Sequence, residues 1–258
     1  MPRAYLRLNH GLTQAFQLIR GLVDGLWLGL ASRRVLYGID AAFYASQGQY
    51  VAEEYTRSGL TDWENAAVSE YFQHCTDIVV TGAGGGREVL ALAGNGRRVT
   101  GFEPNEGMVT FGRTILEGRS DASLLVAPRD GWPALDATFD GAVIGWGSYT
   151  HIAGRRRRVD FLRQTRSHLV AGSPLLVSVY TRPSRTRYHR AVRWVAQPLR
   201  ALRRGAPIDL GDGFAPMYAH HFTREELAAE LADAGFRLEV WRPRPFAHAV
   251  AVAVDPLE

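Results

Sequence analysis

The sequence predicts an α/β protein, in which a helical N-terminal region precedes a mainly parallel β-sheet that ends in an antiparallel hairpin. Up to about residue 72 the pattern is helical, without strand-like alternation. After Thr76, short β-branched runs alternate with helical segments, as in parallel strands covered on both faces. The last two apolar runs, "RLEVW" and "AHAVAVAV", are separated only by "RPRPF", which is too short for a helical crossover. We therefore expect these two strands to pair antiparallel.

Individual elements carry local signals. The five predicted parallel strands are the runs at 77–80, 97–102, 123–127, 139–146 and 173–180. Two helices begin with a capping box, in which a threonine and a glutamate three residues later satisfy free backbone N–H groups. The two pairs are Thr61 with Glu64 and Thr223 with Glu226. Gly235 marks the end of the second of these helices.

The composition is that of an ordinary globular protein, with 46% hydrophobic and 22% charged residues in a chain of 258. Cys75 is the only cysteine, which excludes disulfide frameworks and cysteine-based metal sites and fits a cytoplasmic location. The most apolar stretch, 18–32, is interrupted by Arg20 and Asp24 and is shorter than a membrane span of roughly 18 to 20 residues. We expect it to form a helix that packs on protein, with a membrane-surface helix as the alternative.

Basic charge is concentrated in one segment. All 30 basic side chains are arginine, so a lysine Schiff base is excluded. The segment from Arg182 to Arg204 holds eight arginines and no acid, so the rest of the chain has a net charge of −4 against +4 for the whole. One interpretation is a solvated basic helix. The others are recognition of an acidic small substrate, an anionic membrane surface or an RNA backbone.

The run "VVTGAGGGREVL" places glycines in a turn between a buried strand and a helix, where backbone N–H groups can face a ligand. The following strand ends on Glu103, 21 residues after Gly82, a spacing at which an acid can bind ribose hydroxyls. The dinucleotide fingerprint requires a third glycine where Arg87 stands, and a phosphate-binding Walker loop requires a lysine. The turn therefore predicts a nucleoside site of another kind.

Three motifs in order, "VVTGAGGGREVLALAGNGRRVTGFEP", "FDGAVIGWGSYTHI" and "HFTREELAAELADAGF", make the chain resemble the class I S-adenosylmethionine (SAM)-dependent methyltransferases. The resemblance covers about residues 76–254. It implies a Rossmann-like seven-stranded sheet of order 3-2-1-4-5-7-6 with strand 7 antiparallel. It also implies SAM as the cofactor, with S-adenosylhomocysteine as its product.

By position, the resemblance assigns specific residues to the cofactor. The glycine turn would wrap its methionine and ribose portions, Glu103 would bind the ribose, and the remaining residues would line the adenine and the sulfonium end. The full set is Gly82, Ala83, Gly84, Gly86, Glu103, Pro104, Asn105, Met108, Arg129, Asp130, Gly145 and Trp146. One position departs from the family, because Val80 stands where an acid often helps to hold the cofactor's amino group.

The predicted domains are a helical lid at 1–75 and a SAM-binding domain at 76–258, with an inserted substrate-recognition segment at 181–216. Candidate catalytic residues lie in loops at the carboxyl ends of strands, where ligands bind in such sheets: His151, Tyr149 and His221. Candidate substrate contacts are Tyr50, Tyr55, His220 and Arg182. Most tyrosines of the helical region are expected in the core, and no metal is predicted, because Trp146 rather than an acid ends the fourth strand.

The leading functional prediction is methyl transfer to a small-molecule acceptor, with oxygen favoured over nitrogen or carbon. Positioning of the acceptor supplies much of the rate in such a reaction, with His or Tyr assistance where a proton must leave. An acidic acceptor is one interpretation of the arginines. The alternatives are an RNA or other nucleic-acid methyltransferase that uses the arginine segment, and a catalytically silent SAM-binding relative. The sequence predicts no particular oligomeric state.

Overall fold

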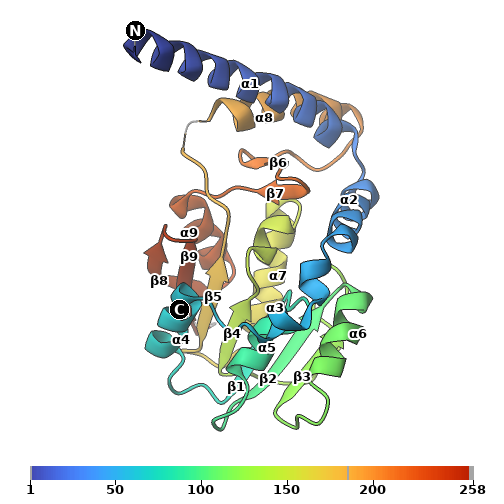
Figure 1. Ribbon diagram of the computed structural model, residues 1–258, viewed down its shortest axis with the longest axis vertical. Helices are drawn as coiled ribbons and strands as arrows, with labels where there is room; N and C mark the ends of the chain where they lie inside the picture. Colours follow the sequence, from blue (N-terminus) through green and yellow to red (C-terminus); the bar gives the residue numbers. More distant parts are fainter. Residues whose placement is uncertain (1, 185, 256–258) are drawn as a thin grey trace.

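The computed structural model describes residues 2–184 and 186–255 and shows an α/β fold built on a seven-stranded sheet (Figure 1). The strands are β1 (Asp77–Thr81), β2 (Arg98–Glu103), β3 (Ala122–Val126), β4 (Gly141–Ile144), β5 (Pro174–Ser178), β8 (Phe236–Arg242) and β9 (His248–Ala253). Their order is β3-β2-β1-β4-β5-β9-β8. The first five are parallel, and β9 pairs antiparallel with both β5 and β8. The predicted sheet order and the terminal hairpin are therefore confirmed.

Helices cover both faces of the sheet, and each face has its own core. Val79 packs on one side with Leu162 and Phe222, and Val80 packs on the other side with Phe72, because successive strand residues point to opposite faces. The covering helices are α4 (Asp62–Tyr71), α5 (Arg87–Leu92), α6 (Glu106–Ile115), α7 (Arg155–Ser167) and α9 (Arg224–Asp233). Both predicted capping boxes are present, on α4 and α9.

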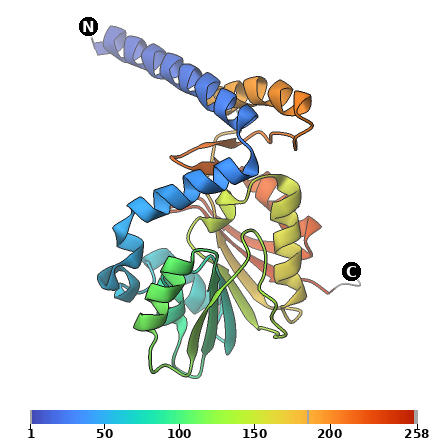
Figure 2. The same ribbon diagram turned by 90° about the vertical axis from the view of Figure 1, so that its right-hand side faces the viewer.

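The N-terminal region divides into two parts. It consists of α1 (Pro2–Leu30), α2 (Arg33–Ser46), the 3-10 helix η1 (Gly48–Val51) and α3 (Glu53–Arg57). Figure 2 shows α1 at one end of the molecule, away from the sheet, while α2 descends toward the sheet. Residues of α2, η1 and α3 line the main cavity, whereas none of α1 does within the described chain. The predicted lid at 1–75 thus contains both a covering part and a separate helix.

The segment after β5 supplies the partner of α1. It forms α8 (Arg187–Leu202), followed by a small hairpin of β6 (Asp212–Phe214) and β7 (Tyr218–His220) that the sequence did not predict. Helix α8 runs alongside α1, and the hairpin lies between this pair and the sheet (Figure 1). Among the described residues, no helix combines the length and apolarity needed to cross a membrane.

Candidate cofactor and active site

A cavity of about 530 Å³ opens at the carboxyl ends of β1, β2 and β4. Ten of the residues that the resemblance assigns to the cofactor line it: Gly82, Ala83, Gly84, Glu103, Pro104, Asn105, Met108, Arg129, Asp130 and Trp146. Gly86 and Gly145 stand behind this lining and shape the turns. The loop between β6 and β7 also reaches the cavity, through residues 215–217. Of the predicted insertion at 181–216, only Ala215 and Pro216 therefore contribute to the cavity wall within the described chain.

The turn after β1 is built for close backbone contact. A Cβ on Gly82 would lie 2.5 Å from Ser148 Oγ, and a Cβ on Gly145 would lie 2.2 Å from the Gly82 carbonyl oxygen. Gly86 has φ +90° and forms the N-cap of α5, a left-handed conformation that glycine adopts without strain. The loops after β1 and β4 therefore touch through their backbones, which leaves the cavity wall smooth at this point.

Glu103 is anchored at the end of β2 by two backbone groups. Its Oε2 accepts a hydrogen bond from Gly84 N at 3.1 Å, and its Oε1 accepts one from Asn105 N at 3.0 Å. Burial raises the pKa of Glu103, and the two backbone hydrogen bonds oppose this effect. The carboxyl group is thus held in a fixed orientation, with two acceptor atoms for a ligand diol.

Val80, at the position where the resemblance implies an acid, is fully buried in the sheet. A carboxylate reaches this end of the cavity from α5 instead. Glu88 lines the cavity, and its Oε1 lies 3.5 Å from the backbone nitrogen of Trp146. Burial raises the pKa of Glu88, while neighbouring Arg87 lowers it. Glu88 is therefore the carboxyl group that the structure offers beside Trp146.

Arg87 links this carboxylate to the N-terminal region. It donates to both oxygens of Glu64, at 2.7 and 2.8 Å, and to Glu88 Oε1 at 2.7 Å. Burial opposes ionisation of Glu64, but the Arg87 guanidinium outweighs it and lowers the pKa of Glu64. The residue that excludes a dinucleotide fingerprint is thus a buried cation that ties α4 to α5.

Helix α2 is fastened across the cavity to the loop after β3. Arg129 forms an ion pair with Asp40, and the Tyr37 hydroxyl donates to Asp130. The Arg129 guanidinium also lies 4.5 Å from the centre of the Tyr37 ring. Burial, together with the hydrogen bond to Asp130, raises the pKa of Tyr37 to about 12. These contacts bring α2 over the position that the resemblance assigns to the adenine.

Aromatic rings form the wall opposite the sheet. Tyr44, Tyr50 and Tyr55 make successive edge-to-face contacts, with ring centroids 5.3 and 5.6 Å apart, and all three line the cavity. Burial raises the pKa of Tyr44 and of Tyr55, so these two hydroxyls stay protonated at neutral pH. The predicted substrate contacts Tyr50 and Tyr55 are therefore at the cavity.

His151 has the geometry of a general base. Its Nδ1 lies 2.7 Å from the Tyr218 carbonyl oxygen, which can only accept, so Nδ1 carries the proton and Nε2 is the acceptor. The ring lines the cavity and meets the Tyr180 ring edge-on at 5.7 Å. Burial lowers the pKa of His151, so the imidazole is neutral at neutral pH.

The Tyr149 hydroxyl points into the protein interior. It donates to Glu230 Oε2 at 2.7 Å, and the same carboxylate accepts from Arg158 at 2.7 to 3.2 Å. Burial and the nearby Glu230 charge raise the pKa of Tyr149 well above its usual value. Its ring borders the cavity, but its proton is held in a buried network between η2 (Ser148–His151), α7 and α9.

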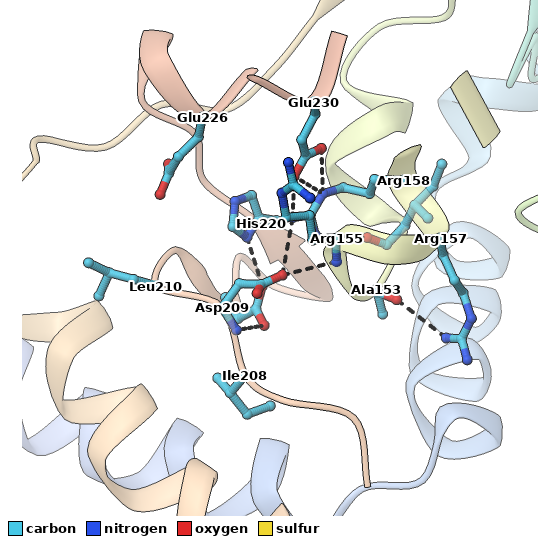
Figure 3. Close-up of polar contacts among 12 residues, drawn as sticks. Ala153, Arg155, Arg157, Arg158, Ile208, Asp209, Leu210, His220, Glu226 and Glu230 are labelled. Atoms are coloured by element: carbon cyan, nitrogen blue, oxygen red, sulfur yellow. Dashed lines mark hydrogen bonds and ion pairs between the residues drawn. The ribbon is translucent and has the colours of Figure 1, made fainter. Parts of the chain in front are cut away.

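His220, His221 and Arg182 lie outside the cavity lining. His220 Nδ1 is 2.8 Å from Asp212 Oδ1, and Arg182 pairs with Glu226 and donates to the Leu210 carbonyl. Figure 3 shows His220 close to Asp209, which accepts from Arg155 and Arg158. The acids Asp209 and Asp212 with His220 have the spacing of metal ligands, but arginine, histidine and tyrosine donors already occupy them. This group is a structural junction between α7, α9 and the β6–β7 hairpin.

Several cavity residues were not predicted as site residues. Asp40, Tyr44, Glu88, Tyr180, Met217 and Phe246 line the cavity, and of these only Glu88 lies within a quoted motif, in the helix after the glycine turn. A helical periodicity places Asp40 and Tyr44 on one face of α2, and this was the one available clue. The others follow from packing between segments far apart in the chain.

Solved structures with the same fold are SAM-dependent methyltransferases. A 1,6-didemethyltoxoflavin-N1-methyltransferase from Burkholderia thailandensis is 17% identical, with 88% of this chain and 92% of that chain covered and a TM-score of 0.62. A sugar N-methyltransferase from Streptoalloteichus is also 17% identical, with 84% and 93% covered and a TM-score of 0.56. A SAM-dependent methyltransferase from Methanosarcina mazei is 20% identical, with 76% and 99% covered and a TM-score of 0.58. No protein-family model and no curated protein matches the sequence. The chain therefore has the Rossmann-like fold of the class I SAM-dependent methyltransferases.

Proposed function

We propose that the protein is a SAM-dependent methyltransferase that acts on a small-molecule acceptor. The observation that carries this proposal is the pairing of the glycine turn with Glu103, whose carboxylate accepts from Gly84 N inside a cavity of about 530 Å³. The solved structures of the same fold, named above as methyltransferases, support it.

The cavity fits the cofactor chemically. Four buried side-chain atoms in residues that line it have no hydrogen-bond partner within the described chain: Asp40 Oδ1, Thr56 Oγ1, Thr81 Oγ1 and Arg129 Nε. Buried polar atoms normally have partners, so a polar ligand suits this wall. Glu103 would bind the ribose hydroxyls, Met108 and Pro104 would contact the adenine, and Glu88 would take the role of the acid absent at Val80.

Bound SAM would supply an electrophilic methyl group. The chain would position the acceptor and exclude water from the cavity. The tyrosine wall of Tyr44, Tyr50 and Tyr55 excludes water from the reacting centre. Trp146 and Tyr180 would hold the acceptor in line with the methyl group. His151 Nε2 would accept the proton that an acceptor hydroxyl or amine loses.

The acceptor is proposed to be a small molecule with a hydroxyl group, with an amine as the next candidate. Two solved structures with this fold are named for N-methylation, of a sugar and of a toxoflavin precursor. Arg87 and Arg129 are the arginines of the cavity lining, and both are paired with carboxylates. Within the described chain, no arginine of α8 lines the cavity. This arrangement favours neither an acidic acceptor nor RNA as the substrate.

Cofactor binding is tested by isothermal titration with SAM. Glu103→Ala removes both ribose acceptors, so we expect affinity to fall by about tenfold or more, since hydrogen bonds to a charged group contribute roughly 1.5 to 3 kcal/mol each. Glu88→Gln should weaken SAM binding by a smaller factor. Glu106→Ala, an exposed acid three residues along, is the matched control and should bind as the wild type does. Absence of binding in the wild type would overturn the cofactor assignment.

Proton acceptance by His151 is tested by S-adenosylhomocysteine formation with a panel of amino and hydroxylated sugars and aromatics. His151→Asn should slow turnover by about 10²- to 10⁴-fold, with SAM affinity unchanged. Since burial lowers the pKa of His151, wild-type turnover should fall only below about pH 6.5 as the imidazole becomes protonated. Equal turnover in the variant would remove His151 from the mechanism. Tight SAM binding without turnover on any acceptor would instead favour the silent relative.

A further inference from the structure

Helix α1 is apolar on two opposite faces. One face carries Gly21, Gly25 and Gly29, against which α8 packs closely. A Cβ on Gly25 would lie 2.8 Å from the Val192 carbonyl oxygen, and one on Gly21 would lie 2.6 Å from the Tyr188 carbonyl oxygen. Each of these positions therefore requires glycine, and there the backbone of α1 lies directly against α8.

The other face of α1 is a stripe of exposed large apolar side chains. The side chains follow one another at intervals of three and four, which places them on one side of a helix, opposite the glycines. This apolar stripe consists of Tyr5, Leu8, Leu12, Phe16, Ile19, Val23, Leu26, Trp27 and Leu30, with exposed fractions between 44% and 74%. Nothing in the described chain covers it.

The size of the apolar stripe is unusual for a free surface. Nine large side chains that are each about half exposed or more present roughly 1,000 Å², against about 300 to 600 Å² for the largest patch of a typical monomer. In addition, residues 2–13 are all exposed, so this half of α1 extends without a neighbour (Figure 2). An isolated helix of that length is marginal in water, which indicates that another surface supports it.

The helix pair behind the stripe is strongly basic. Helix α1 has three arginines and one acid, and residues 187–204 have six arginines and no acid, a net charge of +8 where the whole chain has +4. Five of these are exposed and form no ion pair with described residues: Arg187, Arg190, Arg193, Arg203 and Arg204. Trp194, on the same helix, is 75% exposed. Apolar area and unbalanced positive charge therefore occur together.

We propose that the α1–α8 pair docks on an anionic lipid surface, with α1 lying in the plane of the interface. The stripe would enter the headgroup boundary, as amphipathic helices with an arginine-bearing polar face do. Close glycine packing keeps α8 about one helix diameter behind α1, a distance comparable to the screening length, so its arginines feel the surface potential. A second copy of the chain suits the stripe less well, because it would bring two layers of charge +8 together.

The test is co-sedimentation of the full chain with phosphatidylcholine vesicles, with and without phosphatidylglycerol. We expect binding to the anionic vesicles only, weakening as salt is raised. Phe16→Glu should lower the partition by roughly tenfold or more, since it replaces an exposed ring that would enter the headgroup boundary by a charge. Gln17→Glu adds the same charge to the neighbouring exposed position off the stripe and is the matched control. Arg190→Gln, about one screening length behind the surface, should cost about twofold.

Other outcomes would overturn the proposal. These are absence of vesicle binding, equal binding to neutral and anionic vesicles, or equal losses in Phe16→Glu and Gln17→Glu. If light scattering shows a dimer that Phe16→Glu dissociates, without vesicle binding, a second copy covers the stripe. All variants are also titrated with SAM. Unchanged SAM affinity shows that the variants are folded, and it separates this proposal from the proposed enzymatic function.

Discussion

The sheet body and the α1–α8 pair hold together in opposite ways. In the body, apolar side chains point inward from both faces of the sheet, and strands such as β5 are buried throughout. In α1, three of the four buried residues are glycines, and the large side chains point outward. The body therefore has a core of its own. The helix pair is joined by close glycine packing, by a small apolar cluster that includes Leu28 and Val192, and by polar contacts such as Tyr188 with Asp24. It leaves most of its large apolar side chains available to another surface.

This contrast separates the tasks of the two regions. The cavity lies at the carboxyl ends of the parallel strands and is fastened by ion pairs such as Arg129 with Asp40. Helix α8, which carries the arginines, stands apart from the sheet, with the β6–β7 hairpin in between (Figure 1). A chain with this division can change its attachment surface without disturbing the positions of the cavity residues.

The largest stability effect is expected inside the body, at Glu230. This carboxylate accepts from Arg158 and Tyr149, and both members of the Arg158 ion pair are at most 2% exposed. Glu230→Ala leaves a buried guanidinium with only a partial partner in Asp209, 3.2 Å away. We expect the free energy of unfolding, measured by urea denaturation, to fall by about 3 to 5 kcal/mol.

Asp233→Ala is the control for Glu230→Ala. Asp233 lies on α9, as Glu230 does, but its ion pair with Arg155 of α7 is exposed. Its cost should stay below about 1 kcal/mol. If Glu230→Ala costs no more than this control, the network at the α7–α9 junction does not stabilise the body, and the contrast with the helix pair weakens.

The sequence predicted the body better than the helix pair for a physical reason. Buried parallel strands require near-continuous β-branched runs, which is why "DIVV" and "SPLLVSVY" indicate strands directly. The β6–β7 hairpin was missed because its three-residue strands contain Asp212 and Gly213 and show no alternation. The glycines of α1 did not indicate which element packs against this helix, or on which of its faces, because backbone packing leaves no periodic apolar signal.

The same difference applies to the cavity. Glu103 could be predicted because it lies at a fixed spacing from Gly82 along one strand–helix–strand unit. The Asp40–Arg129 pair joins residues 89 positions apart, and no local pattern encodes it. Tyr149 was placed in the correct loop, but the direction of its hydroxyl depends on Glu230, 81 residues later. Local rules thus locate loops, and tertiary contacts decide which side chains face the cavity.

An effect that is absent at neutral pH and grows in acid is expected where the two regions meet, at His189 of α8. This side chain is buried beside His221, with ring centroids 4.9 Å apart, and neither of its nitrogens has a partner in the described chain. Burial, reinforced by His221 and Arg182, lowers the pKa of His189 to about 3. The folded state therefore keeps it neutral, while the unfolded chain binds a proton below about pH 6.5. The free energy of unfolding is therefore independent of this group above that pH, and it declines by up to roughly 1.4 kcal/mol per pH unit as the pH falls from there toward 3.

His189→Leu tests this pH dependence, because leucine fills the buried site and cannot take up a proton. Urea denaturation at a series of pH values should show a shallower loss of stability below pH 6.5 than in the wild type, with similar stability at pH 8. His74→Leu, at an exposed position, should keep the wild-type slope. Since His189 faces the body from α8, acid should first loosen the helix pair while the sheet stays folded. If His189→Leu and His74→Leu give the same slope, the contact between the two regions does not depend on a neutral His189.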